Sequence, residues 1–509
     1  MFSRQSVFQA STILIIAALV SRTLGFVREM VIAHFLGASL AYDVFLVSLT
    51  FPSMLASIFL YTLPSVFIPV YLKEKISQGD DSAWSYFLNF LNTFASLSLL
   101  VSMFLFFFAP FVIRSYAPSF NSEQLADAIR LLRVLSTIVF FAGLYSIFKG
   151  VLHANKHFLL PAIAPLFLNV MTIISVIFLT SSMATLALAL GWLIGYFFQL
   201  IAVFLIFAKR RPPYNFFINI HDRLLKNTLS ALLLITIVEA IGQLNVVIDR
   251  SFVAFLPEGG ISALSYANTL NHLPIGVLGI TMATSLFPSL AEYAAKKDKI
   301  NLIQLYSKGV RFVLAITIPI ALILYFFAGE IVTLLFQRGA FNQHATTLTS
   351  DALKMLTIGL AAFVVHAILI KIFYAMNNNV TLLISTCLAL VLKIVLSIWL
   401  VKIFMLKGLA LSTSLAGIFN VTLLSFLLRK KIGSIDGKRI GVTFIKVFVI
   451  SIVSFGLGRL TINYMGDLLL IFRIGLAIGL GSIIFVSLVF IFKVEEFMFL
   501  IKKMARTIS

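Results

Sequence analysis

Charged side chains interrupt apolar stretches near the start of the chain. Arg22, Arg28, Glu29 and Asp43 fall inside or between runs of mostly apolar residues. A charge at membrane depth is costly unless it faces protein or water, so such residues are candidates for function. The fork of an arginine guanidinium can bind two oxygens of a phosphate at once. We therefore expect Arg28, together with Arg22, to contact an anionic substrate.

A second arginine, Arg250, occupies the matching place in an internal repeat. A constant shift of 222 residues aligns uncommon residue types in the two halves of the chain. The aligned pairs are Arg28 and Arg250, Gly37 and Gly259, Ala41 and Ala263, Pro52 and Pro274, Lys149 and Lys371, Asn155 and Asn377, and Gly195 and Gly417. Two repeat-related guanidiniums that face one cavity would form a clamp for phosphate or pyrophosphate.

Acidic residues near these arginines leave other interpretations open. Arg28 could simply pair with Glu29 or Asp43, and Arg250 with Asp249. Arg22 and Glu29 are seven residues apart and lie on nearly the same helix face, so a structural ion pair is as plausible as a ligand role. Asp43 opens a predicted helix, where the helix dipole favours an acid. It could equally close a gate through an ion pair with Arg22 or Arg28.

A further group of polar residues lies in a predicted span of the second half. Glu239, Gln243 and, more loosely, Asp249 could fall on one stripe of this helix. Acceptors in a membrane helix suit coupling to Na⁺ or H⁺, although they also form hydrogen bonds between helices. The sequence has no metal-ligand spacing and no phosphate-binding glycine loop. We therefore expect no cofactor, with an ion gradient or the membrane potential driving transport rather than an enzymatic reaction.

The elements that must position these residues are membrane helices. Of 509 residues, 61% are hydrophobic and only 11% are charged, whereas a soluble chain carries roughly 25% charged residues. Apolar segments of spanning length recur throughout, so we expect an all-α polytopic membrane protein with about fourteen transmembrane helices. The predicted spans are 8–34, 41–71, 84–113, 128–150, 158–180, 184–208, 224–256, 262–292, 309–336, 347–375, 379–403, 408–429, 440–463 and 468–492.

The distribution of positive charge predicts the orientation of these spans. The net charge is +20, which in a soluble protein would suggest nucleic acid as a partner. Here Lys and Arg concentrate in alternate loops between the spans, so the positive-inside rule places both termini in the cytoplasm and no nucleic acid is expected.

The repeat divides the chain into predicted domains. Residues 1–208 form an N-lobe of six spans, residues 224–431 a C-lobe of six, and residues 432–509 the last two helices and a cytoplasmic tail. The linker 209–223, within KRRPPYNFFINIHDRLLK, is basic and aromatic, which is typical of a segment at the interface with anionic lipid. Two pseudo-symmetric six-helix lobes that meet at a cavity favour a transporter that works by alternating access.

Three stretches resemble a known family. They are SRTLGFVREMVIAHFLGAS with the following YDVF, GGISALSYANTLNHLPIGVLGITMATSLFPSLAEY, and LLFQRGAF. These resemble the MurJ/MviN lipid II flippases of the multidrug/oligosaccharidyl-lipid/polysaccharide exporter superfamily. The resemblance implies a monomeric, multi-pass protein of the bacterial cytoplasmic (inner) membrane. It would translocate lipid II, an undecaprenyl-pyrophosphate-linked peptidoglycan precursor, from the inner to the outer leaflet.

The resemblance also assigns residues and leaves alternatives open. Arg22, Arg28 and Asp43 match family positions, and the family has a cationic cavity and a groove for the lipid tail between its last two helices. Where the family has Arg-Arg-x-Phe-Ala-Glu-Gly, this chain has residues 56–62 (ASIFLYT), and where it has Tyr-Ala-Asp-Arg, this chain has residues 266–269 (YANT). The alternatives are therefore a flippase for another polyprenyl-linked polysaccharide unit, a multidrug or organic-cation antiporter, or a scaffold that has lost transport.

Overall fold

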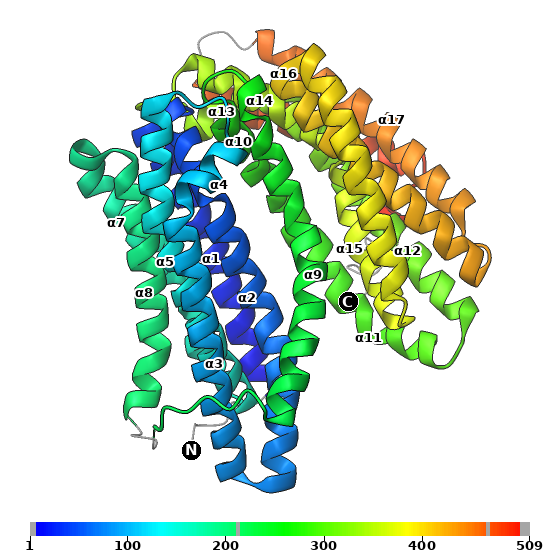
Figure 1. Ribbon diagram of the computed structural model, residues 1–509. Coiled ribbons are helices and arrows are strands. Elements are labelled where there is room, and N and C mark those ends of the chain that lie inside the picture. The colour runs from blue at the N-terminus through cyan, green and yellow to red at the C-terminus, as the bar shows by residue number, and fades with distance from the viewer. Residues whose placement is uncertain (1–6, 210–213, 465–468, 499–509) are drawn as a thin grey trace. The chain divides into compact units, whose positions relative to one another are not determined.

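The computed structural model describes residues 7–209, 214–464 and 469–498. Within these ranges the regular structure is helical and contains no strand (Figure 1). Among the described residues, eleven helices are long and apolar enough to cross a membrane, and twelve if the pair α14 (Gln343–Thr357) and α15 (Leu360–Ala375), bent by 48°, counts as one span. The predicted all-α polytopic membrane fold is confirmed.

The predicted number of fourteen spans stays a prediction, for two identifiable reasons. Helix α16 (Asn379–Ile432) is counted once although it is 54 residues long and breaks at Met405, where φ is 47° and ψ is −124°. Since a span needs about 20 residues, each side of this break is long enough to cross a membrane. Helix α1 (Val7–Leu36) is not one of the eleven helices, although its 30 residues are enough to cross a membrane.

The chain divides into two compact units. The first contains the described residues up to Ala254 together with Arg338–Phe341, and the second contains the rest. The helices of the first unit are α1, α2 (Leu40–Gln78), α3 (Asp80–Phe107), α4 (Ala109–Tyr116), α5 (Ser122–Ala154), α6 (Leu159–Ile163), α7 (Pro165–Met183), α8 (Thr185–Lys209) and α9 (Arg223–Ser251). Helices α2, α3 and α5 lie side by side (Figure 1) and bury an aromatic core in which Phe67 contacts Tyr86 and Phe90.

The loop Arg338–Phe341 closes one end of α1. The backbone N–H of Ala340 donates to the carbonyl of His34 at 2.8 Å. A Cβ atom at Gly37 would lie 2.4 Å from the Ala340 carbonyl oxygen, and φ at Gly37 is +64°. Glycine is therefore required there by both space and backbone conformation. This contact explains why the LLFQRGAF motif and the first-helix motif occur together.

The second unit is built from another set of helices. These are α10 (Gly260–Pro274), the π-helix Ile275–Ile280, α11 (Thr281–Ala295), α12 (Lys299–Phe326), α13 (Ala328–Phe336), α14, α15, α16, α17 (Gly437–Thr461) and α18 (Leu470–Ile491), with a short 3₁₀ segment at Ile462–Tyr464. Another 3₁₀ segment, Phe252–Phe255, lies at the boundary of the two units. The π-helix follows Pro274 directly. Such irregular turns inside membrane helices often occur at functional sites.

The C-terminal helix pair is fastened to its own unit at two points. Arg311 of α12 donates to Glu495 at 2.9 Å and to Glu496 at 2.7 Å. At the other end of α17, Arg459 pairs with Glu330 of α13. Between α17 and α18, the backbones approach closely at Gly458, where a Cβ atom would lie 2.5 Å from the Ala477 carbonyl oxygen.

Backbone irregularities recur in both units and support the repeat. Gly37 and Gly259 both have positive φ. Asn121 caps α5 and Asn342 caps α14, each by accepting a hydrogen bond from the backbone N–H three residues later. The chain also leaves helical geometry at Phe108 before α4 and at Phe327 before α13. These pairs are separated by 222, 221 and 219 residues. The predicted offset of 222 thus holds for the residue pairs aligned from the sequence, while the structure adds pairs at which it differs by up to three residues.

Helix α9 belongs to one half of the chain by the internal repeat and to the other half by its packing. The repeat assigns α9 to the C-lobe, but α9 packs against α2 and belongs to the first compact unit. The predicted domain boundaries follow the repeat rather than the packing, and they stay a prediction.

Candidate functional site

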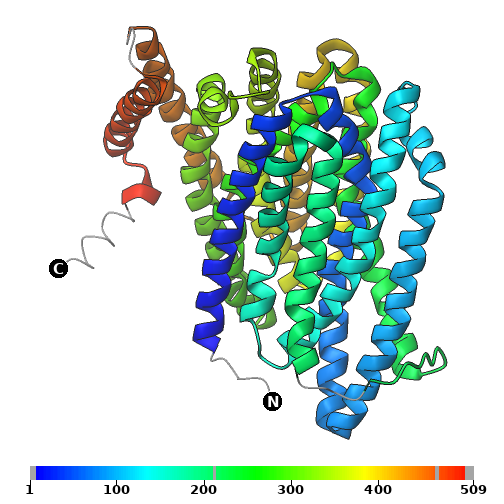
Figure 2. The same cartoon turned by 90° about the vertical axis from the view of Figure 1, so that its left-hand side faces the viewer.

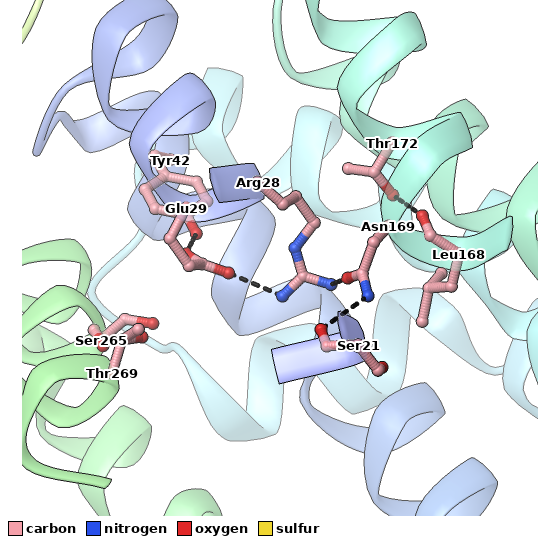
Figure 3. Close-up of polar contacts among 9 residues, drawn as sticks. All are labelled: Ser21, Arg28, Glu29, Tyr42, Leu168, Asn169, Thr172, Ser265 and Thr269. Atoms are coloured by element: carbon pink, nitrogen blue, oxygen red, sulfur yellow. Dashed lines mark hydrogen bonds and ion pairs between the residues drawn. The ribbon is translucent and has the colours of Figure 1, made fainter. Parts of the chain in front are cut away.

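Arg28 lies at the centre of a polar network inside the first unit (Figure 3). Its Nη2 donates to the Glu29 Oε1 atom at 2.7 Å, and its Nη1 donates to the Asn169 Oδ1 atom at 3.0 Å. Asn169 in turn donates to the carbonyl of Ser21 at 3.4 Å. Arg28 and Ser21 lie on α1 and Asn169 on α7, so the network joins these two helices. The pairing of Arg28 with Glu29 that the sequence left open is present.

An aromatic face completes the surroundings of Arg28. The guanidinium carbon lies 5.4 Å from the ring centroid of Trp192 on α8. A cation at this distance is attracted by the ring quadrupole. The Arg28 side chain remains only 16% exposed. A guanidinium has five N–H donors, and the bonds to Glu29 and Asn169 use two of them, so the group retains capacity to bind an oxyanion.

Glu29 links the first two helices. Its Oε1 atom accepts from Arg28, and its Oε2 atom accepts from the hydroxyl of Tyr42 on α2 at 3.5 Å. Asp43 follows Tyr42 in sequence and is likewise buried, whereas Arg22 is exposed. A buried carboxylate needs partners of this kind because an unpaired charge in a low-dielectric interior is very costly. The gate roles predicted for Glu29 and Asp43 and the substrate role predicted for Arg22 stay predictions.

Arg250 has partners of a different kind. Its Nη1 donates to the backbone carbonyl of Leu46 at 2.5 Å and to the hydroxyl of Thr50 at 3.0 Å, both on α2. The hydroxyl of Tyr116 donates to the carbonyl of Val247 at 2.7 Å and holds the same end of α9. Asp249 lies beside these residues and is half-buried. A clamp formed by Arg28 and Arg250 together, and a gate role for Asp249, stay predictions.

Two residues of the predicted acceptor stripe contact each other on α9. The Gln243 Nε2 atom donates to the Glu239 Oε1 atom at 3.4 Å, as expected for residues one turn apart. Both side chains of this amide–carboxylate pair are half-buried. Ion coupling through these two residues stays a prediction. Within the described ranges, no group of three His, Cys, Asp or Glu could hold a metal ion.

The stretches where the resembled family carries charge are occupied by neutral residues. In α2, Ala56, Ile58 and Phe59 are buried in the core of the first unit, while Tyr61 is 68% exposed. In α10, the hydroxyl of Thr269 donates to the carbonyl of Ser265 at 3.1 Å (Figure 3). Neither position therefore supplies a cation.

Two residues of the Arg28 network were not predicted from the sequence. Asn169 and Trp192 lie in apolar spans far from Arg28 in the chain. A lone amide in an apolar span was a usable signal, because such residues commonly form hydrogen bonds between helices. Trp192 gave no such signal, since a tryptophan in a membrane helix is more often placed by its apolar ring.

Broken helices, buried arginines and a repeated pair of helical halves define a polytopic membrane transport protein. A family described as "Lipid II flippase MurJ" matches residues 32–494. A protein from Buchnera aphidicola subsp. Acyrthosiphon pisum named "Probable lipid II flippase MurJ" is 30% identical over 416 residues, which cover 80% of this chain and 81% of that protein. The chain belongs to the MurJ family.

Solved structures agree on the fold. A structure titled "Lipid II flippase MurJ, inward closed conformation" has a TM-score of 0.80 and 24% identity, and the match covers 94% of this chain and 98% of that one. An inward-facing multidrug resistance transporter of the MATE family has a TM-score of 0.69 and 16% identity, and the match covers 83% of this chain and 99% of that one. The likeness to the MurJ structure thus extends over more of the chain.

Proposed function

We propose that this protein is a lipid II flippase, which moves the undecaprenyl-pyrophosphate-linked peptidoglycan precursor from the inner to the outer leaflet. The observation that carries the proposal is the continuous family match over residues 32–494. That match runs through both units and to the end of α18. A relative that matches 80% of the chain is itself named a probable lipid II flippase.

Arg28 binds the pyrophosphate of the substrate in this proposal. The guanidinium is held at one edge by Asn169 and over one face by Trp192, so its orientation is set before the substrate arrives. Glu29 occupies the position of an anion on Nη2, and a pyrophosphate oxygen replaces this carboxylate when the substrate binds. Because the pyrophosphate oxygen takes the place of the Glu29 carboxylate, the Arg28 guanidinium has an anionic partner both before and after the substrate binds.

Transport follows alternating access and draws on the membrane potential. The pyrophosphate is anionic, and moving one elementary charge across 100 mV changes the free energy by about 2.3 kcal/mol. A potential that is negative inside therefore favours outward movement of the headgroup. Glu239 and Gln243 are the residues we assign to any coupled Na⁺ or H⁺, since their pair on α9 offers oxygen acceptors.

The remaining assignments complete the proposal. The protein is a multi-pass component of the bacterial inner membrane that works as a monomer, with both termini in the cytoplasm as the loop charges predict. It acts as a transporter and not as an enzyme.

The neutral side chains of residues 56–62 favour a second candidate function. They leave the site with fewer cations than the resembled family has, so a different polyprenyl-linked saccharide is the alternative substrate. An organic-cation antiporter is less well supported, because the likeness to the MATE transporter is at 16% identity and concerns the fold alone.

Rescue of a bacterium depleted of its own lipid II flippase tests the proposal. We expect this chain to restore growth and to restore lipid II in the outer leaflet. Arg28→Ala should abolish both. Arg114→Ala, which removes an exposed arginine of α4, is the matched control and should rescue like the parent chain.

Failure of a well-expressed, membrane-inserted parent chain would contradict lipid II as the substrate. The saccharide that accumulates when the gene is removed from its host would then identify the second candidate. Rescue that survives Arg28→Ala would instead retain the substrate and overturn the role of Arg28.

A further inference from the structure

The segment that joins α8 to α9 is held against α3 by two asparagines. Asn89 donates to the carbonyl of Asn219 at 3.2 Å and accepts from the Asn219 N–H at 2.8 Å. Asn92, three residues later, donates to the Phe217 carbonyl at 3.0 Å and accepts from the Tyr214 hydroxyl at 2.9 Å. Residues 214–222 therefore form a docked segment with a defined path, and Figure 2 shows this segment on the outer flank of α3.

Phe217 differs in exposure from its neighbours in this docked segment. Phe217 packs against the core of the first unit. Phe216 and Ile218 on either side of it are 71% and 41% exposed, and Ile220 is 58% exposed. Successive side chains of an extended chain point to opposite sides, so docking Phe217 inward turns Phe216 and Ile218 outward. Ile220 lies in the turn that follows and is also exposed. Phe216, Ile218 and Ile220 are here called the apolar row.

The apolar row lies at the level where α3 changes from polar to apolar. Asp80 and Asp81 begin the helix, and Asn89 and Asn92 are the last residues before the apolar run from Phe94 to Phe107. A helix of this composition places its charged end in water and its apolar run in the bilayer. The docked segment therefore lies at the boundary between the two.

Positive charge flanks the apolar row in the sequence. Lys209 precedes the segment, and Arg223 and Lys226 lie in the first turn of α9. Basic residues next to a membrane surface attract anionic lipid, and apolar side chains between them favour insertion at the headgroup boundary. The observations thus identify one partner by its chemistry, an anionic lipid surface.

We propose that residues 214–222 are a membrane anchor, in which Phe216, Ile218 and Ile220 enter the headgroup region of an anionic leaflet. Asn89 and Asn92 set the depth of this anchor by fixing its backbone to α3. Because the segment connects α8 to α9, the anchor holds the entry to α9 at a constant depth. The proposal is independent of which saccharide the protein transports.

Spin labels on single cysteines test this depth. The sequence has one cysteine, Cys387, so Cys387→Ser gives a background for labels at positions 216, 217, 218 and 220. The protein is reconstituted in vesicles of phosphatidylglycerol and phosphatidylethanolamine. Collision rates are then measured with oxygen, which concentrates in lipid, and with a water-soluble nickel complex.

We expect labels at 216, 218 and 220 to collide with nickel several-fold less often than a label at Ser77 near the tip between α2 and α3, and with oxygen several-fold more often. A label at 217 should be protected from both reagents. Nickel collisions at 216, 218 and 220 that equal those at 77 would overturn the proposal. Protection of all four positions from oxygen would also overturn it, because it would show a protein partner or a second copy on this face.

A pair of substitutions tests the role of docking. Asn89→Ala with Asn92→Ala should remove the alternation between 217 and its neighbours, because the backbone loses its fixed path. Replacing phosphatidylglycerol with phosphatidylcholine should raise nickel collisions at 216 and 218 if charge contributes to insertion. An unchanged alternation in the double variant would contradict depth control by the asparagines.

Discussion

Arg28 and Arg250 occupy the same position in the repeat but bind different kinds of group. Arg28 contacts the side chains of Glu29, Asn169 and Trp192. Arg250 contacts the backbone carbonyl of Leu46 and a hydroxyl of the same helix. A side-chain carboxylate can rotate away when another anion arrives, whereas a helix carbonyl cannot move without disturbing the helix. The comparison teaches that the repeat places an arginine at both positions but gives the two arginines different partners.

We expect the largest effect from changes at Arg28. Arg28→Ala should abolish rescue, and Arg28→Lys should restore it only weakly, because an ammonium cannot form the bidentate contact of a guanidinium. Loss of a charge-assisted hydrogen bond of about 1.5–3 kcal/mol corresponds to roughly ten- to hundredfold in transport rate. Flipping of labelled lipid II in proteoliposomes measures this rate. Equal rates for the Lys variant and the parent would show that only the charge matters.

Arg250 should affect stability more than transport. Arg250→Met removes the contacts that fasten α9 to α2, at a cost of about 1–3 kcal/mol in the free energy of unfolding. Thermal unfolding in detergent should show a lower midpoint, while transport per folded molecule stays near that of the parent. If Arg250→Met abolishes transport without lowering the unfolding midpoint, Arg250 binds substrate together with Arg28. The two arginines would then have the same role.

Glu29 provides a sharper test of partner exchange. Glu29→Gln keeps an oxygen acceptor for Arg28 but removes the negative charge that competes with the substrate. We expect tighter substrate binding, with the apparent KM for lipid II lowered by roughly fivefold, which corresponds to about 1 kcal/mol. An apparent KM that rises would show that Glu29 orients Arg28 rather than competing for it. Ser39→Ala, at the cap of α2, serves as a control for general weakening of this region.

Asn169 should have a smaller effect, because it positions Arg28 through one neutral hydrogen-bond acceptor. Asn169→Ala should slow transport by about three- to tenfold, in line with roughly 1 kcal/mol for such a bond. Asn169→Asp should retain the acceptor. Proteoliposome assays should measure KM and the maximal rate separately. A loss of folded protein lowers only the maximal rate, so a change in KM would show that Asn169 positions Arg28.

The sequence predicted the fold class and selected Arg28 as a candidate, and the reasons are physical. Apolar runs of spanning length and a charge inside them are local signals that need no knowledge of neighbours. The partners of Arg28 could not be predicted in this way, since Asn169 is 141 positions away and its contact depends on how α1 packs on α7. The sequence also could not distinguish Arg28 from Arg250, because both are arginines near charged neighbours.

Changes at Trp192 should have the smallest effect, and they test the contrast between Arg28 and Arg250 most specifically. Its indole face lies 5.4 Å from the Arg28 guanidinium carbon, and a contact of this type contributes about 0.5–1 kcal/mol, or roughly two- to fivefold in rate. Trp192→Phe keeps a ring of weaker quadrupole and should slow transport about twofold, while Trp192→Leu removes the ring and should slow it further. Neither change should lower the unfolding midpoint as much as Arg250→Met does, because Trp192 contacts Arg28 and not the joint between α9 and α2. If Trp192→Leu lowers the midpoint and leaves transport per folded molecule intact, the ring is part of the packing, and only Asn169 and Glu29 orient Arg28.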